Sequence, residues 1–199
     1  GINFEMAVIQ LEEFQENKLT TGSAFNQAVR PQGLHYDFEV DTNLFAMFLS
    51  HEFITDDNFK IFSNLRTERL NYDYDNLMLD GRTRADGSAC GFGGCYYSRP
   101  ADTDISFSDN SFRFGFSKKV MTNEFFLQLS KGFRPPQINE LFRLQKAQTL
   151  ADLNSEKIDS LEFGILSNGD NFLNKFVLFS SKKNNYIYKD NDASTVAGG

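Results

Sequence analysis

Hydrophobic and polar residues alternate with a period of two in several long runs of the chain. The clearest run begins with Tyr36, Phe38 and Val40, which alternate with polar residues, and it continues to about residue 53. A period of two places successive side chains on opposite faces of a β-strand. Runs of this kind cover residues 2–14, 35–53, 58–75, 112–117, 125–130, 157–166 and 172–188. The chain is therefore predicted to be all-β, with about seven strands.

The connections between these runs differ in length in a regular way. Tight connections at 55–58, 121–123 and 168–170 alternate with long ones at 15–34, 76–110 and 134–156. Because successive connections of an up-and-down antiparallel sheet lie at opposite ends, one end has tight turns and the other has long loops. Transmembrane barrels show this asymmetry, whereas a compact soluble domain seldom carries two structureless loops of more than ~20 residues. We predict an antiparallel up-and-down transmembrane β-barrel segment, about seven strands of a larger barrel, with long extracellular loops and short periplasmic turns.

Polar and aromatic side chains are assigned places on this pattern. Lumen-facing positions, with mutual pairing as the default, are predicted for Lys60, Arg66, Glu68 and Arg113. The headgroup zone of a membrane suits amphipathic rings at strand ends, namely Tyr72, Tyr74, Phe133, Tyr186 and Tyr188. Packing in a soluble β core is the alternative for each ring. Solvated loop surface is the interpretation for Asp73, Asp75, Asp80, Asp86, Asp102, Asp104 and Asp109.

Composition narrows the possible partners. The 199 residues include 20 Lys and Arg against 27 Asp and Glu, a net charge of −7. An acidic protein is not attracted to nucleic acid or to an anionic lipid surface, so neither partner is expected. No apolar run is long enough for a membrane-spanning helix. The first residues do not resemble a signal peptide and the last, "STVAGG", resemble a loop; we expect both ends to be cuts in a longer chain.

One stretch identifies a family. "SKGFRPPQINELFRLQ", followed by "ADLNSEKIDSLEFGI", resembles the C-terminal barrel region of TonB-dependent outer-membrane receptors. In that family a Gly-Phe-Arg-(Ala/Pro)-Pro strand end leads into a Glu-Leu-(Tyr/Phe) segment, and after a loop the next strand begins with Glu-x-x-(Asp/Asn)-(Ser/Tyr)-x-Glu-x-Gly. The matching positions are Gly132, Phe133, Arg134, Pro135, Pro136, Glu140, Leu141 and Phe142, then Glu156, Asp159, Ser160, Glu162 and Gly164.

The resemblance implies a function and a location. Residues 1–199 are expected to be part of a receptor barrel, without the family's N-terminal plug, its TonB-engaging segment (the TonB box) and its closing strand. Such receptors actively take up a scarce solute, such as a siderophore–metal chelate, a corrinoid or an oligosaccharide. The implied partners are the TonB complex of the inner membrane, through the missing N-terminal part, outer-membrane lipid, and a small-molecule ligand whose identity the sequence leaves open. The implied location is the outer membrane of a Gram-negative bacterium.

The double proline marks a strand end. Proline cannot donate to the sheet ladder and restricts the residue before it, so Pro135 and Pro136 are predicted to stop a strand at its outer rim. The following segment, 138–153, is predicted to lie in an external loop. One apolar helical face is possible there, and packing inside the loop is preferred over ligand contact; its residues are Ile138, Leu141, Phe142 and Leu144.

The remaining candidate chemistry is sparse. Cys90 and Cys95 of "CGFGGC" lie in the longest loop, and glycines around them favour a disulfide over a metal site, since no second Cys pair exists. His35 and His51 are sixteen residues apart on one predicted face, too far for one metal ion, and are interpreted as solvated or lumen-facing. No catalytic set, calcium loop or phosphate-binding loop can be assembled. We therefore expect no enzyme activity, no cofactor and no metal.

Two other functions stay open at this point. The first is a passive porin-like barrel, which a plug domain encoded upstream would exclude. The second is a soluble all-β ligand-binding module, whose apolar faces would build a sandwich core. Extraction behaviour separates the barrel, which needs detergent, from the soluble module.

Overall fold

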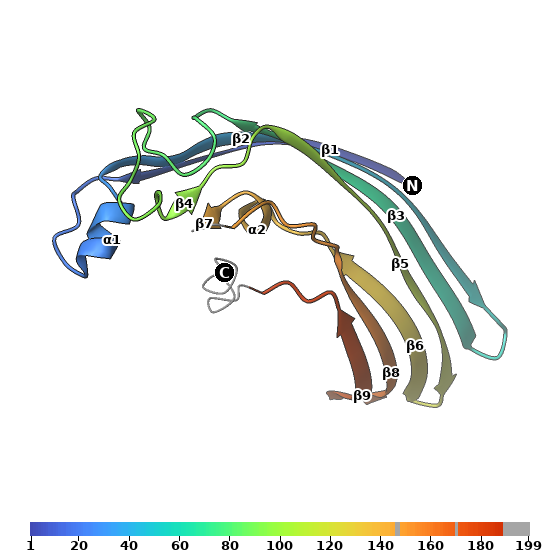
Figure 1. The fold of residues 1–199 in the computed structure, drawn as a ribbon. Helices are drawn as coiled ribbons and strands as arrows, with labels where there is room; N and C mark the ends of the chain where they lie inside the picture. The colour runs from blue at the N-terminus through green and yellow to red at the C-terminus, as the bar shows by residue number, and fades with distance from the viewer. Residues whose placement is uncertain (146–147, 170, 189–199) are drawn as a thin grey trace.

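The sheet of the protein is a curled half-barrel (Figure 1). A computed structural model describes residues 1–145, 148–169 and 171–188. Within these residues seven strands form one sheet in sequence order, each antiparallel to the next. They are β1 (Ile2–Gln15), β2 (Gly33–Ile54), β3 (Phe59–Asn76), β5 (Thr103–Val120), β6 (Asn123–Arg134), β8 (Glu156–Gly169) and β9 (Phe172–Asn184). The predicted strand number and up-and-down order are confirmed.

Tight and long connections lie at opposite ends of the sheet, as predicted. In the described chain the tight ones are at 55–58, between β2 and β3, and at 121–122, between β5 and β6. The third predicted tight connection includes residue 170, which lies outside the described residues. The long connections are 16–32, 77–102 and 135–155. The second is shorter than predicted because β5 begins at Thr103 instead of near residue 112.

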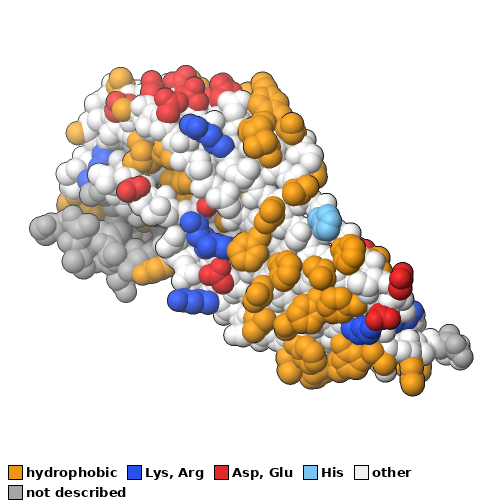
Figure 2. Space-filling model, turned by 90° about the vertical axis from the view of Figure 1, so that its right-hand side faces the viewer, with side chains coloured by type: hydrophobic (Ala, Val, Ile, Leu, Met, Phe, Trp, Pro, Cys, Tyr) orange, Lys and Arg blue, Asp and Glu red, His pale blue; other side chains and the backbone are white. Residues whose placement is uncertain are grey.

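The convex face of the sheet carries a band of exposed apolar side chains near the tight turns. In one row across four strands, Phe116, Leu127, Phe163 and Leu178 lie opposite one another in register. The side chains of Phe116, Phe163 and Leu178 are 40%, 42% and 58% exposed. Figure 2 shows hydrophobic side chains spread across this face, with acidic ones gathered at one end of it. An apolar band this broad fits hydrocarbon rather than water.

The polarity of the two faces is reversed near the long loops. There the convex face carries Asp41, Asp73 and Asp104, which lie opposite one another across β2, β3 and β5. The interpretation of Asp73, Asp75, Asp104 and Asp109 as loop residues was wrong, because all four lie in strands. Asp109 is also not solvated: it faces inward, is 5% exposed and accepts a hydrogen bond from Ser155. The strands therefore extend past the apolar band and end in an acidic zone.

Opposite this acidic zone, the concave face is covered by the long loops. The second and third loops pair through two short strands, β4 (Tyr97–Ser98) and β7 (Leu144–Gln145), beside the helix α2 (Ile138–Leu141) (Figure 1). The first loop holds the helix α1 (Ala24–Val29). None of the helices among the described residues is long and apolar enough to cross a membrane.

A hydrophobic core lies between these loops and the concave face. Phe142 is fully buried, and its ring stacks on that of Tyr74 with centroids 4.3 Å apart. The core also contains Tyr36, Phe38, Val40, Tyr72, Tyr97, Phe107 and Leu141. The headgroup interpretation was therefore wrong for Tyr72 and Tyr74, which are buried under the loops. The preferred interpretation of the loop, packing inside it, is confirmed for Leu141, Phe142 and Leu144, although the helix covers only four residues.

Candidate functional site

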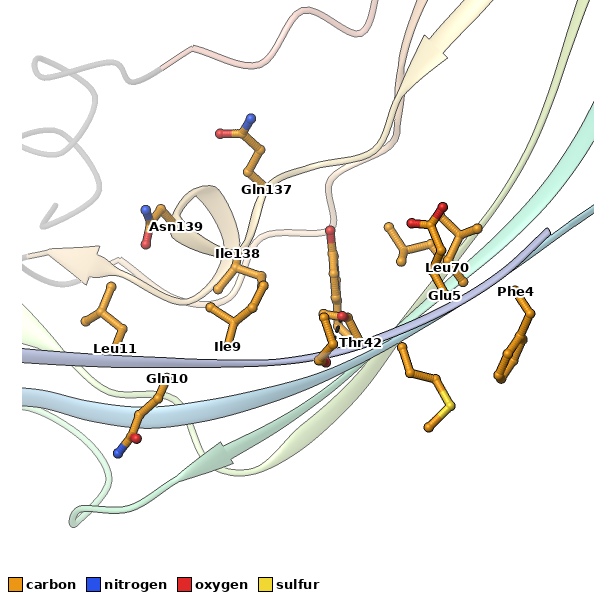
Figure 3. A pocket seen from close by; sticks show the side chains of 14 residues that line it. Phe4, Glu5, Ile9, Gln10, Leu11, Thr42, Leu70, Gln137, Ile138 and Asn139 are labelled. Carbon is orange, nitrogen blue, oxygen red and sulfur yellow. Dashed lines mark hydrogen bonds between the residues drawn. The ribbon is translucent and has the colours of Figure 1, made fainter.

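A hollow of about 820 Å³ opens on the concave face beside α2. Its floor is formed by inward-facing residues of β1, β2 and β3, and its roof by the first residues of the α2 segment. Figure 3 shows Ile9 of β1 and Ile138 of α2 pointing toward one another, with Leu11 alongside, while Phe4 and Gln10 point away from the loop. The other inward-facing floor residues are Glu5, Ala7, Thr42, Leu44, Leu70 and Tyr72. Glu5 is the one charged residue of this lining, so the hollow suits an uncharged or weakly polar group.

The concave wall nearer the tight turns is polar, and its charges are paired. Arg66 contacts Glu68 at 2.5 Å, and Lys60 contacts Glu52 at 3.2 Å. Arg113 faces the same side, where its Nε donates to Oε1 of Gln128 at 2.8 Å. The predicted lumen-facing position is therefore confirmed for Lys60, Arg66, Glu68 and Arg113, and the predicted mutual pairing for Arg66 and Glu68 alone, since the partner of Lys60 is Glu52. A polar inner wall behind an apolar outer band is the arrangement of a barrel around an aqueous interior.

Four charged residues from β6, α2, β8 and β9 lie close together at the rim, beside the Gly-Phe-Arg-Pro-Pro motif. Arg134, the last residue of β6, lies opposite Glu156, the first residue of β8. Its guanidinium donates to Glu156 Oε2 at 2.6 Å and to both carboxylate oxygens of Glu140, in α2, at 3.0 Å each. Lys183 of β9 contacts Glu156 at 3.0 Å. The cluster therefore fastens α2 to the ends of three strands.

The environment of Glu156 favours its ionised form. Its side chain is 3% exposed and lies at the rim, outside the apolar band. The pKa of Glu156 is lowered to about 2, and the hydrogen bond from Arg134 is the largest cause. The backbone N–H of Ile187 donates to Glu156 at 2.8 Å and also lowers the pKa, as does Lys183. The same contacts with Glu156 and Glu140 raise the pKa of Arg134. The cluster therefore stays charged at neutral pH.

The other motif residues are distributed over both faces instead of forming one site. Pro136 is buried, and its carbonyl accepts a hydrogen bond from Tyr72 at 3.2 Å. Asp159 faces outward and is exposed, whereas Glu162 faces inward and accepts from Gln128 at 2.7 Å. The remaining motif residues lie at the end of β6 (Gly132 and Phe133), at the start of the loop (Pro135), in the loop core (Leu141) and in β8 (Gly164). The motif therefore builds the joint between strand, loop and strand.

A family model described as "TonB dependent receptor-like, beta-barrel" matches residues 8–199. The chain belongs to this family. Searches of curated proteins and of solved structures found no match. The family consists of transport receptors rather than enzymes. Membership accounts for the apolar outer band, the polar inner wall and the long loops of this TonB-dependent receptor barrel.

Two inward-facing glycines of the receptor barrel accommodate aromatic rings. Phe62 lies opposite Gly115, and Phe126 lies opposite Gly164. A Cβ added to Gly164 would lie 2.3 Å from Cζ of Phe126, and one added to Gly115 would lie 2.5 Å from Cζ of Phe62. Each ring thus lies flat over a glycine, which only a residue without a side chain permits. The basic groups of Arg113 and Lys175 lie 5.1 Å and 5.7 Å from the centroids of these two rings.

Under the loops of the receptor barrel, a buried arginine holds the second long connection together and fastens it to the start of β2. Arg99 is 2% exposed and donates to the carbonyl oxygens of Leu79 at 2.7 Å, His35 at 3.0 Å and Thr83 at 2.7 Å. His35 is itself 6% exposed and stacks on Tyr97, with centroids 4.4 Å apart. The interpretation of His35 as solvated or lumen-facing was wrong, because a register shift between β1 and β2 beside it turns the ring under the loops. His51 is exposed.

Sequence reasoning missed the hollow and the buried arginine. The signal that marks the hollow is the apolar character of four inward strand positions next to the polar wall nearer the tight turns, namely Ile9, Leu11, Leu44 and Leu70. Arg99 carries no comparable signal, because its partners are backbone carbonyls.

Proposed function

We propose that this chain forms wall and external loops of an outer-membrane receptor of a Gram-negative bacterium that takes up a scarce solute by TonB-energised transport. The solute classes that fit such a receptor are a siderophore–metal chelate, a corrinoid and an oligosaccharide. Within the whole protein, residues 1–199 are one part of the barrel, and the plug, the TonB-engaging segment and the closing strand come from the rest of the chain. The inner-membrane TonB complex is the energising partner.

One observation carries the proposal: the loop cover over the concave face. A passive pore needs an open lumen, whereas here the second and third loops fold inward and bury Tyr74 and Phe142 against the wall. The half-covered hollow beneath α2 leaves a space of about 820 Å³ at the boundary between cover and polar wall. This placement supports binding of a specific solute ahead of its passage through the barrel.

Permeability separates the proposed receptor from a passive porin-like barrel. The full-length protein is reconstituted in liposomes, and entry of sucrose is followed by liposome swelling. A receptor closed by a plug gives no swelling above that of empty liposomes, and it binds the periplasmic domain of TonB in a pull-down assay. Sucrose entry together with failure to bind TonB would overturn the proposal in favour of the porin-like barrel.

The coding sequence around this segment gives an independent check. We expect a plug of about domain size and a TonB-engaging segment upstream, and further alternating strands downstream. Start and stop codons next to residues 1 and 199 would contradict the proposal.

A further inference from the structure

The first two long loops meet in a compact unit at the outer end of the sheet. In it, α1 packs against the ring closed by the Cys90–Cys95 disulfide. The backbone N–H of Tyr96 donates to the carbonyl of Val29 at 2.8 Å, and the guanidinium of Arg30 lies 3.9 Å from the centroid of the Tyr96 ring. We call residues 23–30 together with residues 90–96 the tip. The disulfide closes the second half into a ring, and a backbone hydrogen bond and a cation–π contact join the two halves.

The tip presents a phenylalanine in a backbone conformation that favours glycine. Phe92 has φ +58°, in the left-handed region, and it is followed by Gly93 at +82° and Gly94 at +124°. Three of the four residues inside the disulfide ring are glycine, yet the fourth is a bulky residue under backbone strain. Strain of this kind is found at binding and switch sites, where another role maintains it.

Packing does not account for Phe92, because its side chain is 64% exposed. Its ring contacts that of Phe25 on α1, which is 47% exposed, with centroids 5.3 Å apart and planes at 60°. Two adjacent exposed phenyl rings on a rigid unit form a contact surface for a flat apolar group.

Three arginines lie in or beside the tip of this acidic chain. Arg30 belongs to the tip, where its guanidinium lies over the Tyr96 ring, and Arg82 contacts the tip by donating from Nε to the carbonyl of Cys95 at 3.0 Å. Arg84 is exposed two residues further on. Among the described residues, none of the three arginines forms a salt bridge with a carboxylate. Their charges can therefore attract an anionic group, with Asp86 competing for Arg84.

We propose that the tip is an external capture site for an anionic solute with a flat apolar face. The face lies against Phe25 and Phe92, and the arginines attract the anionic group. The inference deepens the proposed receptor function and rests on it. A protein partner fits less well, because two phenyl rings exposed to this extent offer roughly 200 Å², far below the ~1,200 Å² of a stable protein interface.

Binding of a probe with this chemistry tests the proposal. Full-length receptor in lipid nanodiscs is titrated with 8-anilinonaphthalene-1-sulfonate, an aromatic anion, and with N-phenyl-1-naphthylamine, its uncharged analogue, each corrected for empty nanodiscs. Phe92→Gly removes the ring and relieves the backbone strain, so the fold is retained. We expect it to weaken sulfonate binding at least fivefold, and Arg84→Gln to weaken it about twofold to threefold. Arg84→Gln should leave binding of the uncharged analogue unchanged, whereas Phe92→Gly should weaken it as well, because both probes share the flat apolar face.

A matched control and the contrary outcomes complete the test. Leu77→Ala removes an apolar side chain of the same loop that is 49% exposed and lies outside the tip, and it should leave sulfonate affinity unchanged. Unchanged sulfonate affinity in Phe92→Gly would overturn the proposal, as would an equal loss of both probes in Arg84→Gln. Loss of cross-linking to another surface protein, with sulfonate binding unchanged, would assign the tip to a protein partner instead. TonB binding and sucrose exclusion, measured on the same variants, test the receptor function separately, so either idea can fail alone.

Discussion

Replacing Gly164 by alanine tests how the inner wall is packed. An alanine Cβ at this position would lie 2.3 Å from Cζ of Phe126 and 2.9 Å from the carbonyl oxygen of Phe176. The ring of Phe126 can turn aside, whereas the carbonyl of Phe176 belongs to the backbone of the paired strand β9. We therefore expect the ring to be displaced while the strands stay paired.

The expected cost follows from these distances. Overpacking a filled site costs about 1–3 kcal/mol, and a contact more than 1 Å inside the normal separation of about 3.5 Å places Gly164→Ala in the upper part of that range. Alanine recovers about 0.5–1 kcal/mol of backbone entropy relative to glycine, so the net loss is about 1–2 kcal/mol. In Gly132→Ala the nearest atom is Cγ2 of Ile158 at 3.2 Å, and the same entropy gain brings the net change close to zero.

Unfolding by urea, followed by the gel mobility of unheated samples of the full-length receptor, measures these differences. A double-mutant cycle with Phe126→Ala adds a stronger condition, since removing the ring should cut the cost of Gly164→Ala by at least about 1 kcal/mol. The reasoning fails if Gly164→Ala and Gly132→Ala unfold at the same urea concentration. It also fails if the two changes at 126 and 164 are additive.

Three further changes test the rim, the loop core and the acidic zone. The folded-state pKa of Glu156 is about 2 against an ordinary 4.5, so its ionised form stabilises the rim fully above pH 4.5, and this contribution is lost as pH falls from 4.5 to 2. Protease cleavage of the third long loop should increase over that pH window, and Glu156→Gln should abolish the increase. An unchanged pH profile in Glu156→Gln would contradict the assignment. Phe142→Ala removes a fully buried ring and should cost about 3–5 kcal/mol of loop docking, seen as faster proteolysis of the loops at an unchanged urea midpoint of the sheet; a shifted midpoint would show that sheet and loops unfold together. Asp73→Asn relieves repulsion from Asp41 and Asp104, which lie opposite it, so the urea midpoint should rise at low salt. It should not rise at about 1 M salt, where charges are screened beyond ~3 Å. A rise at both salt concentrations would point to another cause.

The strands were predictable because their pattern is local. The alternation within each run indicates which face of the strand contacts lipid. The lengths of the connections indicate which end of the sheet is extracellular and which is periplasmic. The start of β5 was missed, because on its inner face Ile105 and Phe107 are followed by Asp109, and a buried acid interrupts the apolar alternation. Asp109 is tolerated there because Ser155 of the third loop donates to it, a contact that no local pattern contains.

The loop core was not predictable for the same reason. Alternation alone places Tyr74 correctly on the inner face, but whether that face meets water, lipid or protein depends on Phe142, which is 68 residues further along the chain. The rim cluster was predictable in part, more than the loop core and less than the strands. Resemblance marked Arg134, Glu140 and Glu156 as motif residues, but the reason they occur together is the antiparallel return of the chain, which places the end of β6 opposite the start of β8.

The hydroxyl of Tyr36 donates to the carbonyl of Leu144, and these residues are 108 positions apart in the chain. A contact of this sequence separation forms only after the intervening chain has been ordered, since the entropy of closing the loop must be overcome first. The hairpins at the tight turns, whose partners are neighbours in sequence, have no such delay. The two ends of this sheet therefore form at different times: the wall assembles hairpin by hairpin, and the cover over the lumen closes last.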